Sequence, residues 1–504
     1  MSKNRLILSF AVLPFRGLAA ALAVGAIVLF GATSAAAQGA RVQTKTYDNG
    51  GVYEGTFKDG QRHGQGVYRL PGGFEYDGDW VEGEILGEGV ARYPDGAIYE
   101  GSFARGKPTG FGRITFVDGA SYEGEWTDGA MTGEGVFLHA DGTRHEGRFI
   151  AGLPDGFGTM STPTGYRYEG NWVAGIKEGR GKVFYPDGSV YDGNLSSGLR
   201  SGQGTLTMSD GMVYTGAWRQ DQINGLGRLE QTNGDVYEGL FDNGRRVGQG
   251  RVVYANGDVY DGQFVDDRRQ GTGTFTGVDG YVYNGDWLAG RVHGNGTVTY
   301  PDGSVYVGSF IDDFPEGFGR ITYPDGSTYE GDWVAGVIEG QGIATYAGGA
   351  TYEGGFLNAR NHGLGTIRYP DGYVYEGEWR DGLRHGEGRA SYPDGSVYEG
   401  GFSDGQRDGE GRITMSDGFT YEGGWARGQM EGVGTAAYTN GDVYEGSFAN
   451  GKRQGEGTMT YADGLVVQGT WDNNQMQDAV TSAVDTLPDP SPQPDTDAEG
   501  TVSQ

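Results

Sequence analysis

Hydrophobic and polar residues alternate along this chain in short runs that recur every 23 residues. With Tyr53 as position 0, positions 0 and +4 are aromatic, +2 is glycine, and +1 and +3 are mostly polar. Alternate residues of a strand share one face, so this segment predicts a half-buried β-strand. A second strand is predicted at roughly +11 to +17, where +15 is apolar in all eighteen complete repeats. The pattern therefore predicts an array of β-hairpins.

The period is kept without insertion or deletion from Tyr53 to Val467. Position 0 is tyrosine in seventeen of nineteen repeats, and His145 and Val467 are the exceptions. Position +2 is glycine in all nineteen, and +4 is Phe or Trp in all but one, where Leu195 stands. Positions +11, +13 and +20 are glycine in all eighteen complete repeats. A fixed period of this length indicates a repeat architecture in which neighbouring units stabilise one another.

Glycines mark both the connections and the strands. One connection is predicted around +5 to +11, as in Lys58–Gly64, and the other is a tight turn such as Pro393-Asp394-Gly395, where glycine supplies a positive φ. The glycines at +2 and +13 fall inside strands, where glycine normally weakens a sheet. We expect them to leave room for an aromatic ring from the neighbouring repeat.

These units resemble a known family. The segment YPDGSVYEGGFSDGQRDGEGRIT (Tyr392–Thr414) is similar to MORN (membrane occupation and recognition nexus) repeats, whose signature is a Tyr-Glu-Gly-x-Phe/Trp core with spaced glycines. The resemblance extends from about Asp48 to Trp471. It implies an all-β fold, an elongated single-layer meander of antiparallel hairpins, here with about 36 to 38 strands. It also implies roles in protein assembly, membrane-associated scaffolding and, for some members, phospholipid contact.

The chain is expected to contain four segments. Residues 1–37 have a basic leader, an apolar run and Ala35-Ala36-Ala37, which predicts a helical signal peptide cleaved before Gln38 or, alternatively, an uncleaved signal anchor spanning 17–36. Residues 38–52 form an entry half-repeat, and 53–474 form about eighteen repeats with a terminal strand. Residues 475–504 read as an acidic, Pro-containing disordered tail. Either reading of the leader predicts export, to the periplasm or the extracellular space.

The composition and net charge of the chain limit the kinds of partner that it is expected to bind. The chain contains 100 glycines, 12% aromatic residues and a formal net charge of −30. Such a field repels nucleic acid and anionic lipid surfaces and favours basic partners or divalent counterions. The chain has no cysteine, so disulfides and thiol chemistry are excluded.

No catalytic, cofactor-binding or metal-binding residue is predicted. The recurrent Gly-x-Gly is not followed by the third glycine and helix of a dinucleotide site. Four histidines occupy position +10 and are expected in loops: His63, His293, His362 and His385. His139 and His145 lie at other positions with no nucleophile beside them in the pattern. The acids at +1, such as Glu54 and Asp77, recur at repeat spacing, about 10 Å, which is too far for chelation of one ion.

The leading hypothesis is a non-catalytic scaffold at the cell envelope that binds partner proteins or itself. The alternative is a polysaccharide- or lipid-binding protein that uses an aromatic-lined groove. Rings that alternate between Phe and Trp at +4 are the candidate groove contacts: Trp287, Phe310, Trp333, Phe356, Trp379, Phe402 and Trp425. The competing interpretation is that these rings are the core of a thin sheet.

Overall fold

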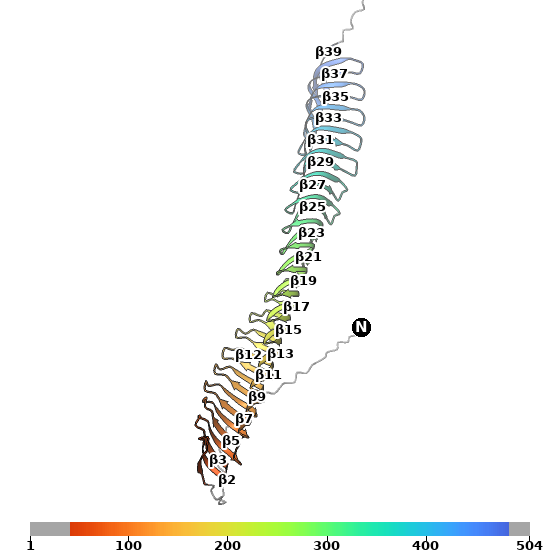
Figure 1. Cartoon of the computed structure of the whole chain (residues 1–504). Coiled ribbons are helices and arrows are strands. Elements are labelled where there is room, and N and C mark those ends of the chain that lie inside the picture. Colours follow the sequence, from red (N-terminus) through yellow and green to blue (C-terminus); the bar gives the residue numbers. More distant parts are fainter. Residues whose placement is uncertain (1–40, 483–504) are drawn as a thin grey trace, which may run out of the picture. The chain divides into compact units, whose positions relative to one another are not determined.

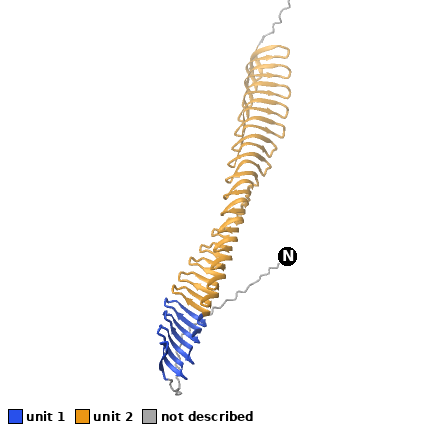
Figure 2. Cartoon of the chain, in the orientation of Figure 1, with its two compact units in different colours: residues 1–130 blue, residues 131–504 orange. Residues whose placement is uncertain are grey.

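The computed structural model describes residues 41–482, and these residues form 39 β-strands and no helix (Figure 1). The predicted signal helix and most of the predicted tail lie outside them. The chain divides into two compact units, residues 1–130 and 131–504 (Figure 2). Within each unit the strands pair antiparallel in chain order, as predicted for a meander of hairpins.

Unit 1 pairs each strand with the next from the first to the eighth. Its strands are β1 (Gln43–Thr46), β2 (Val52–Lys58), β3 (Gln61–Arg69), β4 (Glu75–Val81), β5 (Glu84–Arg92), β6 (Ile98–Ala104), β7 (Lys107–Thr115) and β8 (Ser121–Thr127).

Unit 2 continues the same scheme with two kinds of strand. The seven-residue strands, which contain positions 0 to +4, are β10 (Arg144–Ile150), β12 (Arg167–Val173), β14 (Val190–Ser196), β16 (Val213–Arg219), β18 (Val236–Asp242), β20 (Val259–Val265), β22 (Val282–Leu288), β24 (Val305–Ile311), β26 (Thr328–Val334), β28 (Thr351–Leu357), β30 (Val374–Arg380), β32 (Val397–Ser403), β34 (Thr420–Ala426), β36 (Val443–Ala449) and β38 (Val466–Asp472).

The longer strands alternate with these. They are β9 (Ala130–Leu138), β11 (Leu153–Ser161), β13 (Ile176–Phe184), β15 (Leu199–Thr207), β17 (Gln222–Glu230), β19 (Arg245–Val253), β21 (Arg268–Thr276), β23 (Arg291–Thr299), β25 (Phe314–Thr322), β27 (Val337–Thr345), β29 (Arg360–Arg368), β31 (Leu383–Ser391), β33 (Gln406–Thr414), β35 (Gln429–Ala437), β37 (Lys452–Thr460) and β39 (Gln475–Ser482).

The second strand of each hairpin is longer than predicted. In the first repeat it runs from Gln61 to Arg69, positions +8 to +16, so the expected start at +11 is wrong. Only Asp59 and Gly60 connect the two strands, and their φ angles of 50° and 79° are both left-handed, as a tight hairpin turn of this length requires. Position +11, predicted to end a loop, instead forms part of a β-bulge between Gly55 and Phe57.

The second connection has the predicted turn chemistry. In Tyr392–Ser396, the Gly395 amide donates to the Tyr392 carbonyl at 2.9 Å, and the Tyr392 amide donates to the Ser396 carbonyl at 2.8 Å. Gly395 has a φ of 91°, and the Asp394 carboxylate accepts a hydrogen bond from the Ser396 amide at 2.9 Å. This three-residue loop joins each hairpin to the next.

In the seventeen repeats with tyrosine at position 0, the core is a tyrosine ring lying over two paired glycines. In β28 and β29, Gly354 is paired with Gly365, and a Cβ on Gly365 would lie 2.2 Å from the Tyr352 hydroxyl oxygen. All seventeen tyrosines at position 0 are at most 2% exposed, and each donates its hydroxyl to the backbone carbonyl at +3, at 2.7–3.2 Å. The ring above the glycines therefore belongs to the same repeat, and our expectation of a neighbour's ring is wrong.

The neighbour's ring instead packs roughly perpendicular to that tyrosine. Tyr352 makes edge-to-face contacts with Phe356 of its own repeat and with Trp379 of the next, at centroid distances of 5.0 and 5.2 Å. Seven of the tryptophans also donate their indole N–H to the carbonyl of the +13 glycine in the preceding repeat, as Trp379 does to Gly365 at 3.1 Å. These contacts, each worth about 0.5–1.5 kcal/mol beyond area burial, couple successive repeats.

The array ends one strand later than predicted. Residues 475–482, placed in the disordered tail, form β39, which pairs with β38 from Asp472–Gln475 to Val466–Ser482. The +7 and +11 glycines are replaced here by Asn474 and Asp478. Asn474 nonetheless adopts a φ of 69°, because asparagine tolerates the left-handed conformation, so the turn still forms and the backbone still pairs.

We predict that Gly365→Ala destabilises unit 2 by about 1–3 kcal/mol, because its methyl group would overlap the Tyr352 ring and the core cannot yield without displacing that ring. Thermal or urea unfolding of the full chain measures this. Gly348→Ala is the matched control, since a Cβ there meets nothing within 4 Å. Equal stability of the two variants would contradict the packing described.

Candidate functional site

Beside the buried core, the repeats leave a partly open strip that extends from the three-residue turn towards the two-residue hairpin turn. This strip, called here the tyrosine–arginine strip, is formed by the residues at positions +9, +17 and +21. Position +17 is tyrosine in ten repeats and +9 is arginine in seven. Several of the tyrosines remain accessible, Tyr369 being 43% exposed and Tyr346 40%. Rings of successive turns also meet, as Tyr373 and Tyr392 do at a centroid distance of 5.3 Å.

The arginines at +9 join neighbouring repeats. Each of the seven donates from Nη2 to the backbone carbonyl at +7 of the following repeat, at 2.6–3.1 Å. Five of the guanidinium groups also lie 4.1–4.2 Å from the ring centre of the tryptophan in that repeat, for example Arg407 over Trp425. These arginines were not predicted as functional residues, although their recurrence at a single repeat position is visible in the sequence.

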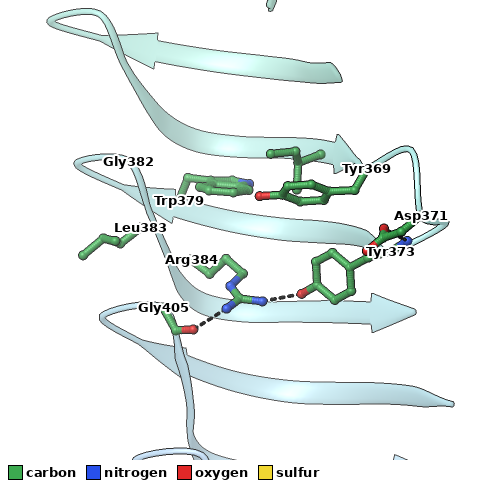
Figure 3. Close-up of a pocket in the computed structure, with 9 residues that line it drawn as sticks. Tyr369, Asp371, Tyr373, Trp379, Gly382, Leu383, Arg384 and Gly405 are labelled. Carbon is green, nitrogen blue, oxygen red and sulfur yellow. Dashed lines mark hydrogen bonds between the residues drawn. The ribbon is translucent and has the colours of Figure 1, made fainter. Parts of the chain in front are cut away.

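A pocket of about 350 Å³ lies in the tyrosine–arginine strip at Arg384 (Figure 3). Arg384 donates to the Gly405 carbonyl at 2.6 Å and also to the Tyr373 hydroxyl, so its guanidinium is fixed in place. Tyr369, Tyr373 and Trp379 supply aromatic surface, and Asp371 lies at the turn. Burial raises the pKa of Tyr373, although Arg384 partly offsets this, so the phenol is neutral and can donate a hydrogen bond.

The same combination recurs at a distant repeat. A second pocket, of about 520 Å³, is lined by Tyr254, Arg269, Phe275 and the turn residues Asp235, Ala255, Asn256 and Asp258. Tyr254 and Arg269 occupy the repeat positions of Tyr369 and Arg384, which are +17 of one repeat and +9 of the next. The two pockets thus share a cation, a phenol and a carboxylate at an open surface. Such a surface can contact an extended chain.

The rings predicted as groove contacts lie in the core. Trp287, Phe310, Trp333, Phe356, Trp379, Phe402 and Trp425 are only 3–7% exposed. Of these, Trp379 lines a pocket, where it lies beside Tyr369 (Figure 3). This burial favours the interpretation that the Phe and Trp rings are the core of a thin sheet. The half-buried tyrosines of the tyrosine–arginine strip are the aromatic side chains that remain accessible.

The histidines are not where the sequence placed them. His63, His293, His362 and His385 lie within β3, β23, β29 and β31, so their assignment to loops is wrong for the same reason that the second strands start early. His139 and His145, six residues apart across a turn, are brought together, with Nε2 of one 3.0 Å from Nδ1 of the other. Burial, with smaller contributions from His139 and Lys177, lowers the pKa of His145 to about 4.

Two further observations concern the described residues as a whole. Within residues 41–482 no helix is long and apolar enough to cross a membrane, and the predicted export segment lies outside that range. In the same part of the chain, no three histidine or carboxylate side chains converge closely enough to hold a metal ion between them.

The comparisons with known proteins agree with the repeat pattern. A family model described as MORN repeat matches eighteen successive segments, from residues 53–74 through residues 444–466. Among curated proteins nothing matches this chain. Among solved structures, the chain is similar to the TCP10 domain of Danio rerio CPAP, with 15% identity over 42% of this chain and 95% of that chain and a TM-score of 0.24. It is also similar to a virginiamycin B lyase from Staphylococcus aureus, with 10% identity over 57% and 83% of the two chains and a TM-score of 0.10. We draw nothing about this chain from likenesses at these TM-scores.

We predict that His145→Tyr stabilises unit 2 increasingly as the pH falls from about 6.5 towards 4. An unfolded histidine takes up a proton near pH 6.5, whereas folded His145, with its pKa near 4, does not. The folded state therefore loses stability over that window, and tyrosine, which is the residue at position 0 in seventeen other repeats, does not titrate there. Thermal unfolding of both proteins at several pH values measures the difference. A difference that stays constant with pH would contradict the prediction.

Proposed function

Because the chain belongs to the MORN-repeat family, we propose that it is a non-catalytic scaffold at the cell envelope that binds an extended segment of a partner protein along its tyrosine–arginine strip. The observation that supports this proposal is the recurrence of one pocket type, at Arg384 and again at Arg269. A ligand that extends across several repeats meets similar chemistry at each, as is usual for repeat proteins.

The chemistry of the strip suits a polypeptide. Tyrosine rings offer a large contact area with little loss of side-chain entropy, and their hydroxyl groups bond to backbone carbonyls. Arg384 is held by Tyr373 and Gly405, so its positive charge is positioned before any ligand arrives. A preorganised donor of this kind can bond to backbone carbonyls of the bound segment and lowers the entropy cost of binding, while the net charge of −30 favours a segment that is basic overall. No family with a catalytic activity is indicated by the comparisons.

A glycan or lipid ligand is the second candidate, through the same half-buried tyrosines, because phenol rings also stack on sugars. We give it second place because the Phe and Trp rings expected to contact it are 3–7% exposed.

Affinity capture with residues 38–504 as bait tests the proposal. A partner identified by mass spectrometry should be lost when Tyr369→Ala and Tyr373→Ala are combined, with at least about a tenfold drop in affinity, because central aromatic contacts carry about 2 kcal/mol or more each. Phe318→Ala is the control, since Phe318 is 62% exposed and lies outside the strip. Sedimentation with envelope polysaccharide and with liposomes forms the parallel arms. Binding of glycan alone that the same double variant abolishes would overturn the protein-scaffold proposal.

Export is a separate part of the proposal and rests on the leader alone. We predict that the mature protein, expressed in full from its own leader and fractionated, leaves the cytoplasm and begins at Gln38. N-terminal sequencing and intact mass measurement check this. An envelope-bound protein that retains Met1 would support the signal-anchor alternative, and a cytoplasmic protein would contradict export.

A further inference from the structure

The repeat that begins at His145 lacks the side chain on which the other complete repeats depend. At the glycines of position +13, a Cβ would lie 2.1–2.5 Å from the overlying tyrosine in sixteen repeats, from Gly66 through Gly457. At Gly158 the nearest atoms are the Glu146 carbonyl oxygen at 3.0 Å and Trp172 Cδ1 at 3.6 Å, and no atom of His145 is among the three nearest. The tyrosine of the other repeats is therefore replaced by the shorter imidazole of His145, and this imidazole is not among the atoms nearest to Gly158.

That ring turns toward His139. The imidazole centroids are 5.1 Å apart with an interplanar angle of 64°, and His139 Nε2 lies 3.0 Å from His145 Nδ1. Both rings are half-buried and supported by aromatic neighbours, His145 by Trp172 at 5.2 Å and His139 by Phe137 at 4.4 Å. The turn that joins β9 to β10 brings the two nitrogens together, and the packing of the rings on Trp172 and Phe137 supports them there.

We propose that His139 and His145 form a binding site for one Cu²⁺ or Ni²⁺ ion. Imidazole nitrogens bind such metals at about 2.0–2.1 Å, so two ligands at 90° to each other lie about 2.8–3.0 Å apart, whereas tetrahedral ligands lie about 3.3–3.4 Å apart. The observed 3.0 Å fits adjacent corners of a square-planar or tetragonal site. This geometry is typical of Cu²⁺ and Ni²⁺ with nitrogen and oxygen ligands, and it disfavours tetrahedral Zn²⁺.

The histidine pair can bind the metal ion without a net release of protons. In the metal-free pair, one of the two facing nitrogens carries a proton and donates a hydrogen bond to the other. When the ion binds, both facing nitrogens supply lone pairs, and the proton moves to the remaining nitrogen of the same ring. Each imidazole stays neutral with one N–H.

The surroundings limit affinity. In the described part of the chain no third histidine or carboxylate converges on the pair, so water completes the coordination. Lys177, whose ammonium donates to the Tyr166 hydroxyl at 2.5 Å, adds positive charge near His145 and opposes the cation. Against this, the whole chain carries a net charge of −30, which concentrates cations around it.

Titration of the purified chain with CuCl₂ tests the proposal, with isothermal calorimetry for stoichiometry and electron paramagnetic resonance for the ligands. The wild type should bind one Cu²⁺ with superhyperfine coupling to two nitrogens. His139→Tyr and His145→Tyr should each weaken binding about tenfold or more and remove that coupling. Both variants carry the residue that is commonest at the same position of other repeats, +17 and 0, so they should fold, which thermal unfolding verifies.

His385→Gln is the matched control, because His385 is another half-buried histidine and glutamine occupies the same position at Gln270. It should bind Cu²⁺ as the wild type does. Absence of binding by the wild type would overturn the proposal and leave a hydrogen-bonded histidine pair. Unchanged binding in the folded His139→Tyr and His145→Tyr variants would overturn it as well, since the ion would then bind elsewhere. These outcomes do not depend on the scaffold function.

Discussion

The structure depends on one contact, a tyrosine ring lying flat on bare backbone. Two glycines face each other across the hairpin at positions +2 and +13, and the ring occupies the space that two Cβ atoms would have filled. Its hydroxyl reaches the carbonyl at +3, so a buried polar group is satisfied within the same repeat. The ring edges then receive one aromatic side chain from the same repeat and one from the next. With a side chain at either glycine position, the tyrosine ring could not lie so close to the backbone, and the aromatic contacts between repeats would not form.

This contact explains why so much of the fold could be predicted. Tyr352, Gly354 and Gly365 each have a role that other residue types rarely perform, and Phe356 can be replaced by Trp, so their equivalents recur almost without exception. Positions +8 to +10 were mispredicted because the pairing there is made by backbone, through a two-residue left-handed turn and a bulge. Side chains as different as Arg62 and Pro315 are tolerated at +9, and no hydrophobic alternation marks the strand.

The candidate sites were harder to predict from the sequence than the fold was, and the physical reason differs from one site to the next. The arginines at +9 occur in seven repeats, and a search for invariant positions passes over them, although each makes the same bond to the next repeat. His139 and His145 could not be paired from the sequence, because their approach depends on a turn and on the missing phenol that frees the space beside His145. The Phe and Trp rings at +4 were correctly seen as a regular row, but spacing alone does not distinguish a row that faces a groove from one sealed beneath it.

The cross-repeat bonds of the arginines and tryptophans have a mechanical consequence. In the described residues of unit 2, each strand pairs with the strand before it and the strand after it in the chain, so a tensile load applied at one end acts first on the last hairpin. The strands would then detach one after another from the loaded end. Because every repeat has the same length, each step would extend the chain by roughly the same amount. Because all but two of these repeats keep their own tyrosine and glycines, a detached hairpin of this kind retains the side chains it needs to dock again when the load is released.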